Sequence, residues 1–145
     1  MTKISSEDVR KEVHRFWAIL SGNLADKLEE MYSPTAIVFT GKAKRSESAK
    51  LMAARRSRKL PGPALASVAE VGSMDIQIVG NDVAIAAYTY SFNTQKILVN
   101  GSKVQINTLL GRATQIFQRG EDGALRIVHE HLSAAAPPAT EKAGE

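Results

Sequence analysis

The stretch from Gly111 to Ser133, GRATQIFQRGEDGALRIVHEHLS, carries the clearest structural signal in the chain. It reads as two long antiparallel strands joined by a polar turn, Gly120–Gly123 (GEDG). The second strand carries His129 and His131, and residues two apart on a strand lie on the same face. On a regular strand this face holds three further residues: Leu125, Ile127 and Ser133. We therefore expect both imidazoles to lie beside apolar side chains that face the interior.

The composition is that of a soluble globular protein with one domain. The chain has 145 residues, 43% of them hydrophobic and 23% charged, which is enough for one sizeable core. It has no cysteine, which excludes disulfides and thiolate catalysis. No apolar run approaches the length of a membrane span, and the N-terminus lacks the apolar core of a signal peptide. We expect a cytoplasmic protein that does not bind membranes.

Positive charge is concentrated in one segment of the sequence. Residues 42–59 hold eight of the 19 basic residues and a single acid, Glu47, whereas the rest of the chain is slightly acidic. Such a segment either attracts an anionic ligand or forms the solvated face of a helix. No nucleic-acid-binding motif accompanies it and no aromatic residues are interleaved with it, so we expect no nucleic-acid partner.

Helix and strand patterns follow one another in an order that defines the fold class. Ser5 or Ser6 can cap a first helix, whose apolar residues recur at helical spacing up to a stop at Gly22. The other predicted elements are helices over 23–32 and 46–59, and strands over 36–40, 66–79, 83–95, 103–119 and 124–133. Helices gathered on one face of a curved antiparallel meander give an α+β fold that encloses a cavity. Residues 1–133 form one domain in this interpretation, and residues 134–145 form a disordered tail.

Two stretches resemble a known group of proteins: Ile78–Ala84 (IVGNDVA) and Asp122–Ser133 (DGALRIVHEHLS). They are similar to the SnoaL-like and ketosteroid-isomerase-like members of the nuclear-transport-factor-two-like superfamily. The ending is also similar to the association domain of calcium/calmodulin-dependent protein kinase type two. The resemblance covers Val9 to Ser133 and implies a cone-shaped, cystatin-like α+β fold. This fold hosts isomerases, cyclases, dehydratases, transport adaptors and oligomerisation domains, so it does not define one function.

The chain departs from both groups at the positions that carry their chemistry. Ketosteroid isomerases have an acid just after the first strand, where this chain reads Thr40–Arg45 (TGKAKR) without any acid. The kinase association domain lines its cavity with arginines, and the matching places here hold Tyr90 and Gln115. The resemblance therefore carries neither that isomerase mechanism nor that ligand preference to this chain.

His129 and His131 are the candidate catalytic residues, because histidine can give or take a proton near neutral pH. The alternative is that both are hydrogen-bonded structural residues. A zinc site needs at least a third ligand, and His14 lies far away on the first helix, so we expect no metal and no cofactor.

The register of the hairpin decides which residues lie opposite the histidines. If the strands close on a four-residue turn, Thr114 faces His129 and Arg112 faces His131. We favour this register and count Thr114 and Arg112 as candidate ligand-binding residues. A slip of one residue would place Gln115 and Ala113 there instead.

Further candidates for ligand binding come from other elements. Arg55 falls in the middle of the apolar face of the third predicted helix, where it either binds an anion or extends its head to solvent. Tyr88 and Tyr90 share a strand face, and their hydroxyls could orient a ligand. Trp17 and Tyr32 complete the candidate set, although an aromatic residue on an apolar helix face is more often part of the core.

These features predict a SnoaL-like cone that binds a small, partly apolar molecule, with a negative charge on it if Arg55 contributes. If the protein is an enzyme, we expect acid–base chemistry by His129 or His131: isomerisation, cyclisation or dehydration. The alternative is a non-catalytic ligand-binding or association domain. In either case a homodimer is expected.

Overall fold

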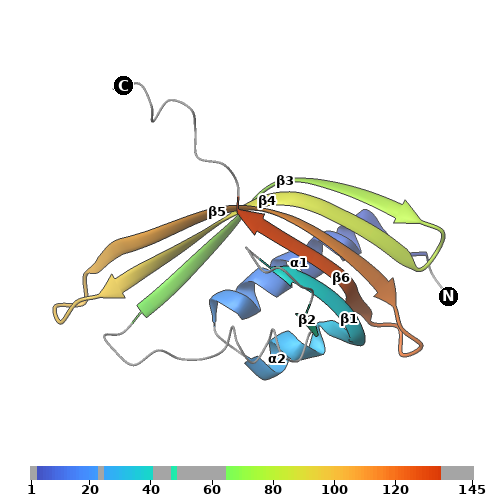
Figure 1. Ribbon diagram of the computed structural model, residues 1–145, viewed down its shortest axis with the longest axis horizontal. Coiled ribbons are helices and arrows are strands. Elements are labelled where there is room, and N and C mark those ends of the chain that lie inside the picture. The colour runs from blue at the N-terminus through green and yellow to red at the C-terminus, as the bar shows by residue number, and fades with distance from the viewer. Residues whose placement is uncertain (1–2, 23–24, 41–46, 49–64, 135–145) are drawn as a thin grey trace.

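The computed structural model describes residues 3–22, 25–40, 47–48 and 65–134. One curved six-stranded sheet lies over two helices, which cover its concave face (Figure 1). The strand order is β2-β1-β6-β5-β4-β3. The elements are α1 (Ser6–Ser21), α2 (Ala25–Glu30), β1 (Tyr32–Thr40), β2 (Glu47–Ser48), β3 (Leu65–Val79), β4 (Val83–Ile97), β5 (Lys103–Arg119) and β6 (Leu125–Ala134). The α+β class and the antiparallel meander of the last four strands are confirmed.

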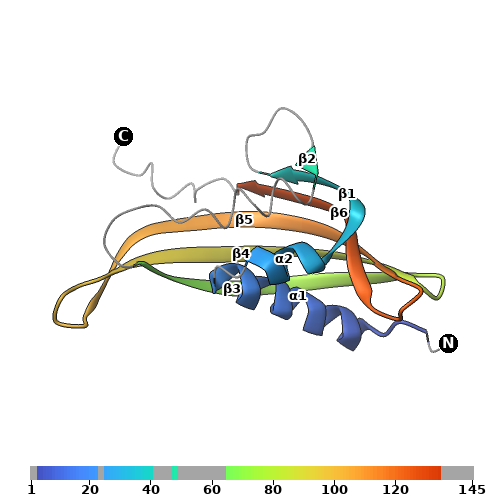
Figure 2. The same cartoon turned by 90° about the horizontal axis from the view of Figure 1, so that it is seen from below.

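Helix α1 forms where its capping residues and apolar stripe predict it. The Ser5 side chain accepts a hydrogen bond from the Asp8 backbone at 3.1 Å, and the Asp8 carboxylate accepts one from the Ser5 backbone at 3.0 Å. The buried face of α1 carries five side chains: Val9, Val13, Phe16, Trp17 and Ile19. They pack against the concave face of the sheet, and among the strands α1 lies nearest to β3 (Figure 2).

Two boundaries in the first half of the chain differ from the prediction. Strand β1 begins at Tyr32 instead of residue 36, so Ser33-Pro34 lies within a strand at an irregularity in its pairing with β6. Glu47 and Ser48 form a short strand that pairs with β1, whereas a helix was predicted from residue 46. Residues 49–59, including Arg55, lie outside the described residues. The predicted tail also lies outside them, apart from Ala134, which ends β6.

The turn between β5 and β6 is held by charged side chains. Arg126 donates two hydrogen bonds to Asp122, at 2.9 and 2.5 Å, and the Ala124 backbone donates a third at 3.1 Å. The hydrogen bond from Arg126, followed by that from Ala124, lowers the pKa of Asp122 from 3.8 to about 2. Gly123 completes the turn with φ of 84°, a backbone conformation that favours glycine.

This turn should make the stability of the folded protein depend on pH in the acidic range. Folding lowers the pKa of Asp122, so its ionised carboxylate stabilises the folded state. This stabilisation is complete at pH values above the ordinary pKa of 3.8 and is lost as pH falls towards about 2. We expect Asp122→Asn to lower the melting temperature at pH 6, and the difference from wild type to shrink between about pH 4 and pH 2. A difference that stays constant over this range would contradict the assignment.

Candidate functional site

A β-bulge in β6 determines which side chains of this strand enter the interior. Ile127 pairs with Phe117 of β5, but the next pair is His129 with Ile116, so Val128 is an extra residue. The alternation of faces therefore changes at Val128. Ile127 faces the core, whereas His129 and His131 turn to the outer, convex face of the sheet.

The expectation that the histidines share a face with Ile127 and line the interior is therefore wrong. His129 is half-buried and His131 is exposed. Both rings lie near Phe39 of β1 on the outer face, with centroid distances of 6.4 and 5.9 Å. Their catalytic role stays a prediction, and in this geometry it would require a ligand on the outer face.

Thr114 and Arg112 share the outer face with the histidines, as the favoured register implied. Each pairs with a residue of β6 two positions beyond the predicted partner. Thr114 lies opposite His131, and Arg112 lies opposite Ser133. Arg112 is exposed and Thr114 is half-buried. These two candidates therefore do not lie on the face that packs against α1.

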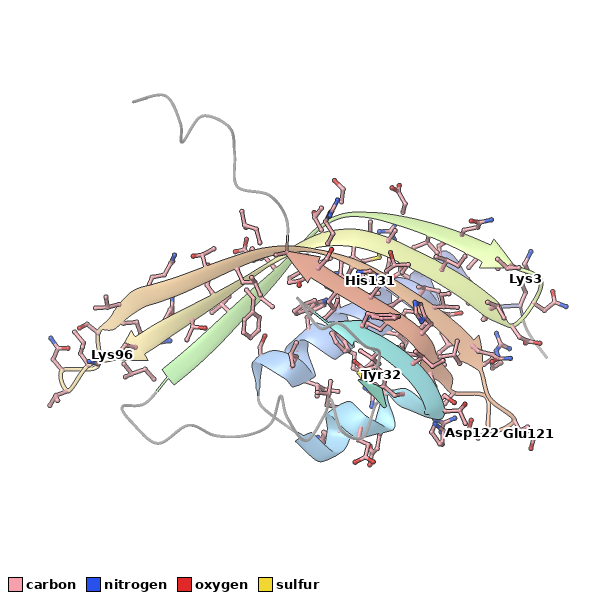
Figure 3. The ribbon with its side chains drawn as sticks, in the orientation of Figure 1. Lys3, Tyr32, Lys96, Glu121, Asp122 and His131 are labelled. Atoms are coloured by element: carbon pink, nitrogen blue, oxygen red, sulfur yellow. The ribbon has the colours of Figure 1, made fainter. Side chains whose placement is uncertain are left out.

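Glu130, which lies between the two histidines on β6, points into the interior. Its side chain is completely buried, and its strand neighbours are Val38 of β1 and Gln115 of β5. The carboxylate accepts hydrogen bonds from the Tyr32 hydroxyl, at 3.0 and 2.9 Å to its two oxygens. It also accepts one from the Gln115 side-chain amide at 2.7 Å. The position of Tyr32 beneath the sheet is visible in Figure 3.

The hydrogen bonds continue from Glu130 towards α1. The Tyr88 hydroxyl donates to the Gln115 side-chain carbonyl at 2.7 Å and accepts from Trp17 Nε1 at 2.9 Å. We call these five side chains, Trp17, Tyr88, Gln115, Glu130 and Tyr32, the interior network. It links α1, β4, β5, β6 and β1, and two of its members, Gln115 and Glu130, are the buried polar or charged residues of the described part of the chain. Buried polar groups of this kind are costly unless they are satisfied, and here each has a partner.

Tyr90 lies next to the interior network and contacts its tryptophan. Its ring packs on Trp17 with centroids 4.4 Å apart and planes at 32°. The opposite strand carries Gly111, where an added Cβ would lie 2.2 Å from the Tyr90 ring. The absence of a side chain at Gly111 therefore allows Tyr90 to occupy its place beside Trp17.

The interior network brings together three predicted ligand-binding residues, Trp17, Tyr32 and Tyr88, and adds two that sequence reasoning missed. Gln115 was considered as an alternative neighbour of the histidines and as a counterpart of an arginine in the association domain, but not as a candidate site residue. Glu130 was not considered, although it is the acid between them, and an acid on a central strand is itself a signal. A carboxylate held by donors inside an aromatic core can orient a ligand or exchange a proton with it.

Tyr88→Phe tests whether the network is formed as described. The change removes the acceptor of Trp17 Nε1 and the donor to Gln115 while keeping the ring. We expect a loss of about 1–3 kcal/mol in the free energy of unfolding, since buried polar groups lose partners. Trp17 is the single tryptophan, so its fluorescence should shift as well. A variant as stable as wild type with unchanged emission would contradict the network.

A separate cleft, called the edge cleft below, opens at the end of the sheet where β1 and β6 begin and β5 ends, with a volume of about 620 Å³. It lies where β1 leaves β6: Tyr32 pairs with Ile127, but the next pair is Ile37 with His129. The cleft is lined by Glu30, Tyr32, Ser33, Pro34, Gln118, Arg119, Gly120, Glu121, Arg126 and Val128. It shares only Tyr32 with the interior network, so the two are distinct sites.

Metal binding and membrane crossing were also considered on the described residues. Within 3–22, 25–40, 47–48 and 65–134, no three His, Asp or Glu side chains come close enough to hold a metal ion. His14 is exposed on α1. Neither of the helices in these ranges has the length and apolar character needed to cross a membrane.

Comparison with known proteins identifies the fold. No protein-family model matches the chain, and no curated protein does either. An NTF2-like protein with a cystatin-like fold from Novosphingobium aromaticivorans is 17% identical, with a TM-score of 0.67 over 94% of this chain and 86% of that one. The calcium/calmodulin-dependent kinase II hub homology domain of Chlamydomonas reinhardtii is 20% identical, with a TM-score of 0.69 over 90% and 98%.

A third similar structure is the beta subunit of benzoate 1,2-dioxygenase from Burkholderia mallei. It is 12% identical, with a TM-score of 0.75 over 93% of both chains. The chain thus has the cystatin-like fold of NTF2-like proteins, and the predicted resemblance to this superfamily and to the kinase association domain is confirmed at the level of fold. At these identities the similarity does not extend to an activity.

Proposed function

We propose that this protein binds a small, partly apolar molecule on the concave side of the sheet, where the interior network supplies the polar contacts. The observation that carries the proposal is Glu130, a completely buried carboxylate beside the apolar side chains of the core. Ligand sites in proteins are mostly apolar and aromatic with a few placed polar groups, and Trp17, Tyr88 and Tyr90 supply the aromatic surface. The negative charge expected on the ligand rested on Arg55 and stays a prediction.

If the protein is an enzyme, we propose proton transfer by Glu130 as its chemistry. A carboxylate that is shielded from water and oriented by Tyr32 and Gln115 is suited to act as an acid or base. Isomerisation, cyclisation and dehydration all require such a transfer. Trp17 and Tyr88 would then position the substrate, because they stand at the α1 end of the hydrogen-bonded chain. We also propose a cytoplasmic location.

The test is a ligand screen followed by matched variants. Wild-type protein is titrated with a panel of neutral and anionic aromatic or alicyclic ketones and acids, and binding is followed by Trp17 fluorescence. For a compound that binds, Glu130→Gln should weaken affinity or turnover at least about tenfold, since it removes a charge from the site while keeping its size. His129→Gln/His131→Gln should change neither, because both side chains lie on the outer face. The opposite pattern would overturn the proposal in favour of the histidines.

An association domain is the second candidate, and the outer face favours it. Ile37 is 52% exposed and Phe39 36% exposed on β1, beside the two histidines. One similar structure is a hub homology domain. Exposed apolar side chains that cluster on a sheet face are typical of protein–protein contacts.

The homodimer predicted from the sequence would use this outer face. Light scattering at high salt, where contacts between charges are screened, should give a dimer for wild type and a monomer for Ile37→Ser/Phe39→Ser. A monomer at every concentration for wild type would count against this second candidate.

A further inference from the structure

The β4–β5 hairpin ends in an apolar tip that projects away from the helices. Leu98 is 37% exposed and Val99 is fully exposed at 110%. The turn that presents them is ordered: the Leu98 backbone donates to Ser102 at 2.8 Å, and the Gly101 backbone donates to Leu98 at 2.9 Å. A surface that is already ordered loses little conformational freedom when it binds a partner. The tip lies at one end of the molecule, where Lys96 is labelled in Figure 3.

The charge around the tip is entirely positive. Lys96 and Lys103 flank it on the two strands, and both are exposed. The sequence from Val83 to Gly120 contains no acidic residue at all. Across the described ranges, neither lysine takes part in an ion pair. The tip therefore combines exposed apolar side chains with two cations that have no counter-charge among the described residues. It is suited to an acidic partner that also offers apolar contacts.

The edge cleft has the complementary character. Its two arginines form ion pairs within the chain: Arg126 with Asp122 at 2.5 Å, and Arg119 with Asp82 at 4.0 Å. Its carboxylates Glu30 and Glu121 are exposed, and no ion pair within the described part of the chain involves them. The apolar part of the lining consists of Tyr32, Pro34 and Val128. The charges left over in the cleft are therefore negative.

We propose that the hairpin tip of one copy docks in the edge cleft of a second copy. Leu98 and Val99 would cover Pro34 and Val128, while Lys96 and Lys103 approach Glu30 and Glu121. Figure 3 labels Lys96 and Glu121 at opposite ends of the molecule, so a chain cannot fill its own cleft. The contact joins two different surfaces and is head-to-tail, which distinguishes it from a dimer through the outer face. Because the positive tip and the negative cleft belong to the same chain, a second copy of this chain is favoured over a membrane as the partner of the tip.

Reversing the charges of the tip and of the cleft in separate variants gives the sharpest test. Sedimentation velocity of the full chain at low salt should show association that grows with concentration and weakens as salt is added. Lys96→Glu/Lys103→Glu and Glu30→Lys/Glu121→Lys should each weaken self-association about tenfold or more, because attraction becomes repulsion at two pairs. Mixing the two variants should restore a complex, in which the tip and cleft charges are again opposite.

Control variants separate this contact from net charge and from other occupants. Lys3→Glu/Lys11→Glu changes the net charge equally on the α1 side and should associate like wild type. Leu98→Ser/Val99→Ser should weaken association while circular dichroism shows an unchanged fold. Wild type that stays monomeric, or mixed variants that fail to form a complex, would overturn the proposal. Binding of wild type, but not the tip variants, to phosphatidylserine vesicles in place of self-association would also overturn it.

Discussion

Glu130→Ala is expected to lower the free energy of unfolding by about 2–6 kcal/mol, since two buried groups lose their acceptor at about 1–3 kcal/mol each. These groups are the Tyr32 hydroxyl and the Gln115 amide, which donate to Glu130 at 2.7 to 3.0 Å. Urea unfolding followed by circular dichroism measures the difference. Among changes to β6 this one should be large, because Glu130 connects β1 and β5 through its side chain.

Glu130→Gln is the matched control for this prediction. Glutamine keeps the size of the side chain, and its single oxygen can still accept from both Tyr32 and Gln115, as one oxygen of Glu130 does. We expect a loss of about 1 kcal/mol, near the net value of one hydrogen bond. His131→Ala, one residue away on the outer face, should cost less than about 0.5 kcal/mol. Equal effects of Glu130→Ala and His131→Ala would contradict the assigned faces.

Gly111→Ala is expected to destabilise the protein by about 1–3 kcal/mol, because the added methyl group overfills the core. A Cβ at this position would lie 2.2 to 2.6 Å from atoms of the Tyr90 ring, which is itself packed on Trp17 at 4.4 Å. The ring must move for the methyl group to fit, so the fluorescence of Trp17 should change together with stability. Urea unfolding and emission spectra of the same samples test both consequences.

A double-mutant cycle shows whether the effect passes through Tyr90. Tyr90→Val removes the ring that the methyl group meets, so Gly111→Ala should cost much less in this background than in wild type. The interaction energy should be about 1 kcal/mol or more for two residues in contact. Additive effects of the two changes would mean that the methyl group is accommodated elsewhere.

Local patterns in the sequence predict most of the described fold. The capping box at Ser5 and Asp8 and the apolar stripe of α1 depend on neighbours three or four residues away, which a sequence displays directly. The long strands and glycine turns are also local. The early start of β1 at Tyr32 was missed because Ser33-Pro34 is typical of a break, and here it lies at an irregularity of strand pairing.

The interior network could not be predicted, for a reason visible in β6. A bulge at Val128 adds one residue to β6, and nothing in the sequence Leu125–Val128 (LRIV) marks where the extra residue falls. The turn before it has five residues between Arg119 and Leu125, one more than expected. The longer turn and the bulge each shift the pairing by one residue. Together they keep Thr114 and Arg112 on the same face as the histidines, whereas the bulge places Ile127 on the opposite face.

The contacts of Glu130 are beyond pattern reasoning for a second reason. Tyr32 is 98 residues away in sequence and Gln115 is 15 away, so their meeting depends on how β1 joins β6 in parallel. A strand pairing between distant segments leaves no local trace in the sequence. Tyr32 was a candidate only because it is aromatic.

The central claim is that Glu130 faces the interior of the sheet and His131 faces outward. The chain has no cysteine, so a single cysteine at either position reports its own exposure. Thiol labelling of the dilute native protein should modify His131→Cys about as fast as the unfolded chain, whereas Glu130→Cys should react only when the protein unfolds. Rapid labelling of Glu130→Cys together with protection of His131→Cys would contradict the account.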